Sequence, residues 1–390
     1  PDGRPGVQDR TYSSVMALSR VSFPRCGLPV GSAKPFGLAA AALAAALLAG
    51  CGGDQRVGEP DPAVAGDAYT AAVSKPLTPS AEAGVSTPAS LDAVPSLSGK
   101  VHYGVPTAAA TGPGATLSGA VPFPLADAWN RDVTARAVDA ASSALVATIG
   151  WHGSLRAGFG ALAGVPYAVV DAAAPRVPVA VAGDPVPRAW PIPATIAPSA
   201  DAAARLAVVD RDAGVLYELR GAARDAASGG WTADAIAAWR LDLADATPID
   251  AAGPDLDGGM PVFAGLVRRD EAANGAIRHA LRITVPAVRR AWVAPARSAA
   301  SGAPDASLLP LGARLRLKAD VAIPADASLE ARAILQALKT YGAIVVGTGP
   351  GLSLDGVPDP SWDAARLAAD LARIRGADFE VLALDPVTVR

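Results

Sequence analysis

The histidines of this sequence are the residues best suited to acid–base chemistry near neutral pH, and there are three of them. His279 lies in IRHALRITVP, where the alternation of a strand groups it with the apolar Leu281 and Ile283. Asp270 and Glu271 precede it in GLVRRDE, and a histidine near carboxylates is typical of a hydrolase. A histidine on an apolar strand face is also typical of a satisfied core residue, and both interpretations stay open.

The other two histidines have different surroundings. His152 lies in GWHGSLRAGFG, a glycine-rich loop after an expected helix, where a functional loop and an ordinary turn are equally open. His102 falls in a low-complexity segment and is expected to be solvated. The chain has two cysteines and no His or Cys spacing typical of a metal site, so we predict no metal and no other cofactor.

Tryptophans are the next candidates for ligand contact. Of the seven in the chain, four lie beside glycine, proline or an expected helix cap, where an indole ring could stack on a sugar. These four are Trp151, Trp190, Trp231 and Trp362. The alternative for each of them is packing in the core.

The stretch YGAIVVGTGPGLSLDG, residues 341–356, looks like a strand that runs into a phosphate-binding loop. A dinucleotide loop requires Gly-x-Gly-x-x-Gly followed by a helix, but Gly347, Gly349 and Gly351 alternate and no helical pattern follows. We therefore predict no nucleotide partner, and the net charge of −3 argues against nucleic acid. The stretch instead predicts a helix end at Gly342, a strand and a turn.

The elements that must position these residues are mostly short strands. RLAVVDRDAGVLYELR, residues 205–220, predicts a hairpin that turns between Asp210 and Gly214. In ARLRLKADV, residues 313–321, leucines alternate with basic residues, which predicts a sheet with one solvated face. Such runs favour a mainly β fold, an antiparallel β-sandwich with a few flanking helices (α+β).

Three helices are expected beside the sheets. DASLEARAILQALKTYG predicts one with a cap at Asp326 or Ser328, and SWDAARLAADLARIRG predicts another with Ser361 as its cap. A third is expected within residues 134–149. We expect a single β-rich domain over residues 121–390.

The N-terminal segment has the order of features found in export signals. Basic residues precede an apolar run over residues 36–48, too short to cross a bilayer, and the run ends in Leu48-Ala49-Gly50-Cys51. This resembles the lipobox of bacterial lipoproteins, and the resemblance implies that residues 1–50 are removed and Cys51 is lipidated. Met16 is the first methionine, so residues 1–15 could precede the true start.

Residues 51–120 are rich in Ala, Pro, Ser and Thr and show no sustained period. Such a segment cannot bury enough apolar surface to offset its ordering entropy, so we predict a lipidated, disordered tether. Gly52 and not an aspartate directly follows Cys51, so the expected location is the outer membrane of the cell envelope, with the membrane as a partner through the lipid anchor.

Residues 164–380 resemble a group of secreted bacterial proteins of unknown function. The resemblance is carried by phrases such as GVPYAVVD, GLVRRDE, LPLGARLRLKAD and DGVPDPSWD. It implies a β-rich secreted domain and no catalytic residues. Several loops that are polar in the group are apolar here, for example VVGTGPGLSL, and this pattern favours a non-catalytic relative.

These observations favour an envelope-anchored lipoprotein with a non-catalytic binding domain for a glycan or another envelope partner. Two alternatives are kept. The first is a carbohydrate-active hydrolase that uses His279 with Asp270 or Glu271. The second is a structural protein of the envelope.

Overall fold

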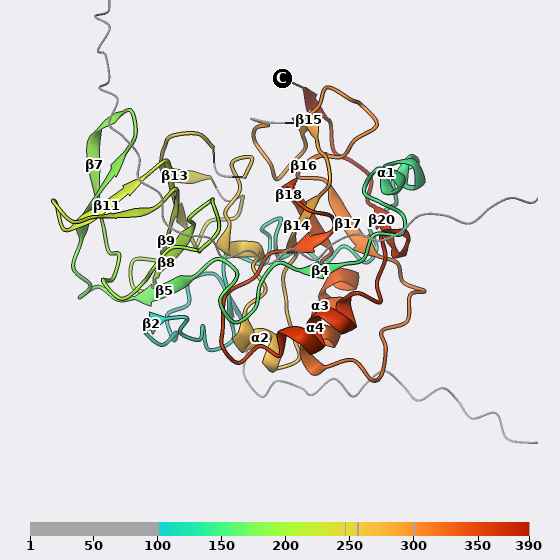
Figure 1. The fold of residues 1–390 in the computed structure, drawn as a ribbon, viewed down its shortest axis with the longest axis horizontal. Helices are drawn as coiled ribbons and strands as arrows, with labels where there is room; N and C mark the ends of the chain where they lie inside the picture. The colour runs from blue at the N-terminus through green and yellow to red at the C-terminus, as the bar shows by residue number, and fades with distance from the viewer. Residues whose placement is uncertain (1–100, 246, 256, 300–301, 390) are drawn as a thin grey trace, which may run out of the picture. The chain divides into compact units, whose positions relative to one another are not determined.

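The computed structural model describes residues 101–245, 247–255, 257–299 and 302–389 (Figure 1). The predicted signal peptide, the lipobox with Cys51 and the part of the tether before residue 101 lie outside the described residues. Within the described ranges, no helix has the length and apolar character needed to cross a membrane.

A six-stranded sheet and a four-stranded sheet make up one region of the domain, shown mainly in green and yellow in Figure 1. The six-stranded sheet has the order β13-β12-β9-β8-β5-β2 and the four-stranded sheet the order β10-β11-β6-β7. The predicted hairpin is confirmed as β8 and β9, whose register pairs Asp210 with Val215. The strands are β2 (Gly112–Pro113), β5 (Tyr167–Val170), β6 (Val177–Val181), β7 (Asp184–Trp190), β8 (Leu206–Asp210), β9 (Val215–Arg220), β10 (Ala223–Asp225), β11 (Gly230–Ala233), β12 (Ala235–Arg240) and β13 (Pro248–Ala252).

The two sheets of this region share a small apolar core. Trp190 of β7 packs on Tyr217 of β9 with ring centroids 4.9 Å apart, and Trp231 of β11 is buried in the same cluster. Face-to-face packing of this kind is the sandwich arrangement expected from alternating strands. Pairing is mixed, because β5–β8 and β6–β11 are parallel whereas the hairpin pairs are antiparallel.

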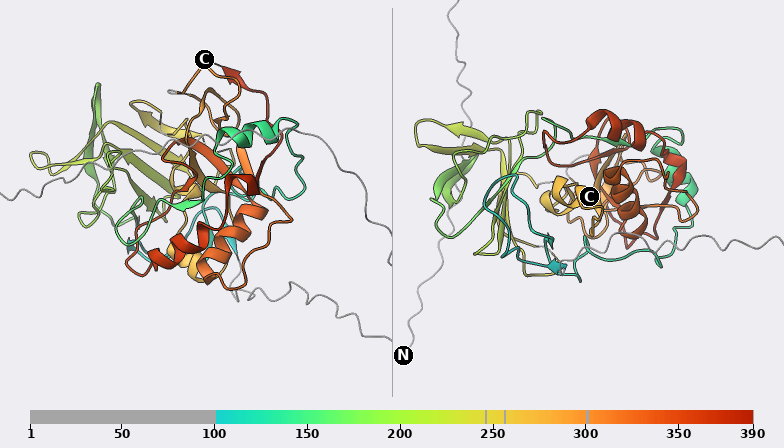
Figure 2. Two further views of the ribbon diagram at one scale, coloured as in Figure 1. Left: turned by 45° about the vertical axis from the view of Figure 1, so that its right-hand side comes forward. Right: turned by 90° about the horizontal axis from the view of Figure 1, so that it is seen from below.

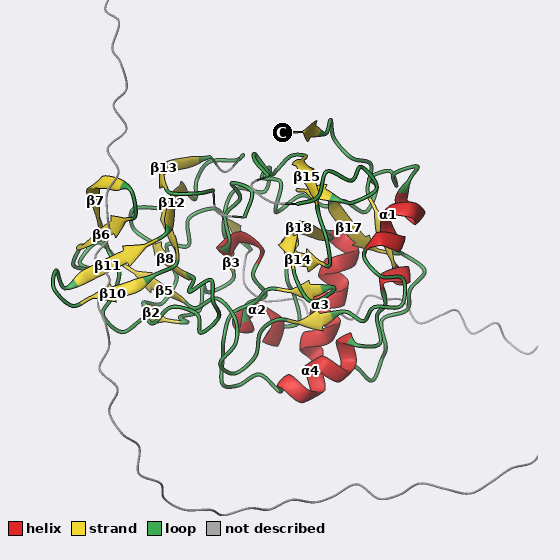
Figure 3. Cartoon of the chain, turned by 45° about the horizontal axis from the view of Figure 1, so that its top comes forward, coloured by secondary structure: helices red, strands yellow, loops and turns green. Residues whose placement is uncertain are grey.

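A second six-stranded sheet, of order β20-β17-β18-β14-β19-β4, lies in the larger core together with the helices (Figures 2 and 3). Its central pair, β14 and β18, is parallel. The prediction of a mainly β fold with a few helices is confirmed. The strands of this sheet are β4 (Arg156–Ala157), β14 (Leu281–Val285), β17 (Arg314–Leu317), β18 (Ala343–Thr348), β19 (Ser353–Leu354) and β20 (Phe379–Val381).

Four α-helices and two short 3₁₀ helices accompany this sheet. They are α1 (Ser142–Thr148), α2 (Arg269–Ala273), α3 (Leu329–Thr340), α4 (Ala364–Leu371), η1 (Phe263–Gly265) and η2 (Gly376–Asp378). Ser328 caps α3 as predicted, since its side chain accepts from the backbone of Ala331. The cap of α4 is Asp363 and not Ser361, whose hydroxyl instead donates to Asp359 in the preceding turn.

Residues 101–120, which the sequence analysis assigned to the tether, belong to the folded domain. β1 (His102–Tyr103) pairs with β3 (Ala120–Val121), and β2 extends the first six-stranded sheet. Leu117 is fully buried in the larger core. The boundary predicted at residue 121 is therefore too late, because a few apolar side chains suffice to seat a segment on a core that already exists.

Residues 341–356 form β18, a tight turn and β19. Gly342 ends α3 with a φ of +70°, as predicted for a glycine after a helix. A Cβ atom at Gly349 would lie 2.2 Å from the Thr284 hydroxyl, so this glycine allows the turn to pass close to β14. A third small sheet, β16 (Pro310–Leu311), β15 (Arg289–Trp292) and β21 (Thr388–Val389), completes the domain.

Candidate functional site

The structure brings two of the predicted site residues into direct contact. Glu271 lies on α2, and its Oε1 is 2.9 Å from Nε2 of His279, which precedes β14. The other ring nitrogen, Nδ1, lies 2.8 Å from the carbonyl of Ala280. Each ring nitrogen of His279 thus faces an oxygen acceptor.

Arg268 completes this cluster, which we call the Arg268–Glu271–His279 network. Its Nη2 donates to Oε2 of Glu271 at 2.5 Å, and the His279 side chain is 0% exposed. Burial by itself raises the pKa of Glu271, but Arg268 and His279 outweigh burial and hold this pKa below its usual value. The Glu271 carboxylate and the His279 imidazole are thus hydrogen-bonded to each other, with the imidazole fully buried and the carboxylate nearly so.

Asp270 faces a different environment, although it is the neighbour of Glu271. Its Oδ2 accepts from the Thr116 hydroxyl and from the backbone N–H of Leu117, both at 3.0 Å. It lines a cavity of about 330 Å³ together with Tyr167 and Asp359. Asp270 therefore ties residues 116–117 to α2, and its Oδ1 lies 3.6 Å from Nε of Arg268, whereas Glu271 is the carboxylate that contacts His279.

The candidate tryptophans separate into one exposed residue and three core residues. Trp151 is 41% exposed and lies next to the exposed His152 in the loop after α1. Trp190, Trp231 and Trp362 are 4%, 1% and 6% exposed. The stacking surface proposed for these three is corrected to core packing, because neighbouring side chains cover their rings.

Trp362 illustrates why an indole beside a cap was taken for a surface group. Its Nε1 donates to the carbonyl of Val357 at 3.0 Å, and its ring packs on Phe159 at 5.1 Å between centroids. The guanidinium of Arg269 covers the ring at 5.2 Å. The residue satisfies its polar atom locally while it buries its ring, which is usual for tryptophan in a core.

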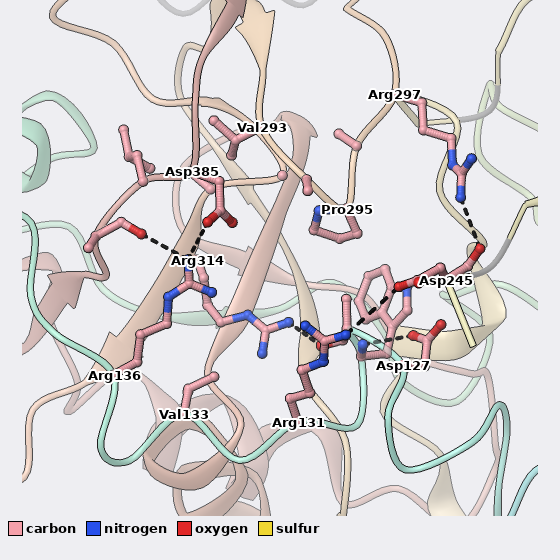
Figure 4. Close-up of a pocket in the computed structure, with 18 of the residues that line it drawn as sticks. Asp127, Arg131, Val133, Arg136, Asp245, Val293, Pro295, Arg297, Arg314 and Asp385 are labelled. Atoms are coloured by element: carbon pink, nitrogen blue, oxygen red, sulfur yellow. Dashed lines mark hydrogen bonds and ion pairs between the residues drawn. The ribbon is translucent and has the colours of Figure 1, made fainter.

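A pocket of about 390 Å³ unites side chains that the sequence analysis did not group (Figure 4). We call it the arginine pocket. Four arginines and four aspartates line it beside apolar side chains: Arg131, Arg136, Arg297, Arg314, Asp127, Asp132, Asp245, Asp385, Val293, Pro295 and Leu384. These residues come from the segment before α1, the loop between β12 and β13, the loops around β15 and β17, and the C-terminal segment.

Two arginines of the pocket are paired with aspartates. Arg136 Nη2 lies 3.0 Å from Asp385 Oδ1 and also donates to the carbonyl of Ala383 at 3.0 Å. Arg131 lies 3.8 Å from Asp245, and both side chains are well exposed. These pairs mark the solvent side of the pocket, where ion pairs contribute little to stability.

Arg314, at the start of β17, is buried and differently satisfied. Its guanidinium donates to the carbonyls of Ala128 and Tyr341. No carboxylate of the described residues lies within 4.0 Å of it. Burial lowers the pKa of Arg314 to about 10, and the nearby charges of Arg136 and Arg131 add to the decrease.

Trp129 adds a hydrogen-bond donor to the same pocket. It is 1% exposed, and its Nε1 has no hydrogen-bond partner among the described residues. A buried N–H without a partner costs about 1–3 kcal/mol. An acceptor supplied by a ligand would remove that cost.

Sequence reasoning missed Arg314 because the alternation in ARLRLKADV placed it on a solvated face. In the structure Arg314 is buried, and Arg316 lies against the carboxylate of Glu380 at 2.7 Å. Both faces of β17 are therefore covered. No spacing in the sequence could join Arg131 and Arg136 to Arg314, since nearly 180 residues separate them.

The described residues contain no group of three or more His, Cys, Asp or Glu side chains arranged to hold a metal ion. No protein-family model matches the chain, and no curated protein and no solved structure is significantly similar to it.

Proposed function

We propose that this chain is a lipid-anchored protein of the bacterial cell envelope whose folded domain binds a ligand and does not catalyse a reaction. One contrast supports the binding role. The histidine and the carboxylate best suited to catalysis are paired with each other inside the core, whereas the arginine pocket has exposed charged residues at its solvent side. A site of that kind can hold a ligand without any chemical step.

The location rests on the resemblance of Leu48-Ala49-Gly50-Cys51 to a lipobox. The test is fractionation of bacterial cells that produce the protein. Cys51→Ser should move the protein from the membrane to the soluble fraction, because the anchor depends on acyl chains on that cysteine. Cys26→Ser, which alters the other cysteine of the chain, is the matched control and should leave the protein in the membrane. Unchanged fractionation of Cys51→Ser would contradict the anchor.

The proposed ligand is a glycan or another component of the envelope. The test is co-sedimentation of the full-length protein with purified cell-wall polysaccharide. Ala383→Trp places an indole at the wall of the arginine pocket and should abolish binding by filling space. Ala369→Trp, on the exposed side of α4, changes bulk outside the pocket and should bind normally. Absence of binding by the unmodified protein would refute the proposal.

A carbohydrate-active hydrolase is the alternative function. Its support is that His279 and Glu271 do meet at 2.9 Å and that Asp270 lines a separate cavity. Hydrolysis of any member of a polysaccharide panel, lost in Asp270→Asn, would establish this alternative. A blank panel leaves the binding role as the better description.

A further inference from the structure

Arg314 is a buried cation with no carboxylate within 4.0 Å among the described residues, and this is the feature of the arginine pocket that points to a ligand. The residue is 8% exposed, and its hydrogen bonds go to neutral carbonyls. Buried charges in proteins are ordinarily paired with an opposite charge or a metal. The charges of Arg136 and Arg131 oppose that of Arg314, and the more weakly acting charges of Asp127 and Asp385 favour it without contacting it.

The aspartates of the pocket do not supply the missing charge. Asp385 pairs with Arg136, and Asp245 lies beside Arg131. Asp132 Oδ1 accepts from the backbone and hydroxyl of Thr134, and Asp127 Oδ1 accepts from the backbone of Trp129. Each aspartate thus has a closer partner of its own, and none of these carboxylates lies within 4.0 Å of the Arg314 guanidinium among the described residues.

The remaining walls indicate how large the ligand is and what else it contacts. Trp129 contributes a buried indole N–H with no acceptor, and Val293, Pro295 and Leu384 form an apolar wall. The pocket of about 390 Å³ is more than ten times the roughly 30 Å³ that one water occupies in the liquid, so a simple inorganic ion would leave most of it unfilled. The fitting ligand combines an anionic group with a carbon skeleton.

We infer that the arginine pocket binds an acidic saccharide, with its carboxylate or phosphate group held by Arg314 and the Trp129 indole N–H. A planar guanidinium suits both groups, since it donates two parallel hydrogen bonds to their oxygens. The choice of a saccharide rests on the proposed function, whereas the need for an anion rests on the side chains of the pocket alone.

The test compares three sugars that differ at one carbon: glucose, glucuronate and glucose 6-phosphate. Titration calorimetry with the full-length protein in detergent measures each affinity. Glucuronate or glucose 6-phosphate should bind at least about 10-fold more tightly than glucose, as expected for a charge-assisted contact. The preferred one of the two decides between carboxylate and phosphate. Equal affinity for all three sugars, or no binding of any, would overturn the inference.

Two variants connect the preference to the pocket. Arg314→Met should remove the preference for the charged sugar, and its circular dichroism spectrum shows whether it folds. Arg136→Gln removes a positive charge from the pocket at a partly exposed position, so it does not disturb a buried side chain. It should weaken binding of the charged sugar about 3- to 10-fold. Arg373→Gln is the matched control, because Arg373, just after α4, is similarly exposed and pairs with Asp326 at 2.9 Å. An equal loss in Arg136→Gln and Arg373→Gln would count against the site.

The outcomes separate the inference from the proposed function. Binding to cell-wall polysaccharide that is blocked by Ala383→Trp but not competed by glucuronate or glucose 6-phosphate leaves the function standing and removes the inference. Binding of a charged sugar without any binding to the polysaccharide does the reverse.

Discussion

The Arg268–Glu271–His279 network and the arginine pocket both contain buried cationic side chains, and they differ in what balances those charges. In the network, Glu271 lies between Arg268 at 2.5 Å and His279 at 2.9 Å. In the pocket, the hydrogen bonds of Arg314 go to carbonyl groups, and the charged side chains around it, Arg136, Arg131, Asp127 and Asp385, do not contact it. In the first cluster a carboxylate contacts the buried cation, whereas in the second no carboxylate of the described residues lies within 4.0 Å of it.

This difference teaches that a buried charge by itself does not mark a functional site. The ion pairs of a complete network form in the folded protein without a ligand. Removing one partner destabilises the fold, because the other charge stays buried without its partner. A buried cation that no carboxylate contacts can instead form its ion pair with an anionic ligand, and the pair then contributes to binding. Testing the two clusters in the same way therefore separates structural charge from binding charge.

The largest expected effect comes from breaking the network. Glu271→Gln should lower the free energy of unfolding by about 3–5 kcal/mol, because the buried Arg268 loses its closest carboxylate and keeps only Asp270 at 3.6 Å. Glu330→Gln alters a more exposed partner of Arg269 and should cost less than about 1 kcal/mol. Urea unfolding measures both. A loss below about 1 kcal/mol in Glu271→Gln would show that the network does not stabilise the fold.

Glu218 sharpens the comparison, since it is a buried carboxylate whose hydrogen-bond donors are neutral. It accepts from Trp239 Nε1 at 3.0 Å and from the backbone of Val262 and Phe263 at 3.0 and 2.7 Å. Burial raises the pKa of Glu218 to about 7 from 4.5, and these hydrogen bonds offset burial only in part. In Glu271, by contrast, two cations reverse the direction.

The pH dependence of stability should report this difference. Because the pKa of Glu218 is higher in the folded state, the folded state binds the proton more tightly. Its contribution to stability is therefore full below pH 4.5 and is lost as the pH rises through about 7. The expected loss is about 3 kcal/mol, from about 1.4 kcal/mol per pKa unit. The free energy of unfolding of Glu218→Gln should not show this decrease between pH 4.5 and about 7. A pH profile identical to that of the unmodified protein would contradict the raised pKa of Glu218.

A smaller effect is expected when the unbalanced charge is removed. Arg314→Met should change the free energy of unfolding by no more than about 1.5 kcal/mol. It removes an unpaired buried cation, which is favourable, but it also leaves the carbonyls of Ala128 and Tyr341 without their donor. Urea unfolding without added ligand gives the value. A loss as large as that of Glu271→Gln would mean that Arg314 serves the fold as the network does.

The smallest effect is expected outside both clusters. Trp151 is the one candidate tryptophan with an exposed ring, and Trp151→Ala should change stability by no more than about 0.5 kcal/mol. Binding to cell-wall polysaccharide should stay within twofold, since the proposed ligand occupies the arginine pocket. A large loss of binding would move the binding surface to the loop of Trp151 and His152.

Local features of the fold were predictable because they depend on residues a few positions apart. The hairpin of β8 and β9 follows from alternation around a turn, and the limits of α3 follow from Ser328 and Gly342. The cap of α4 was misplaced because Ser361 and Asp363 are both good caps and lie two residues apart. The contact of His279 with a carboxylate was also within reach, because Glu271 lies only eight residues away.

By itself, the sequence determined the mainly β character, the hairpin and the ends of α3, since these depend on local periodicity and backbone preference. Only the tertiary structure decided which charges are paired. Arg314 lies about 180 residues from Arg131 and Arg136 and about 70 from Asp385, and their distances depend on how the sheets and loops pack. Burial and partner, which separate a structural charge from a binding one, arise from contacts between distant segments, and no local pattern encodes them.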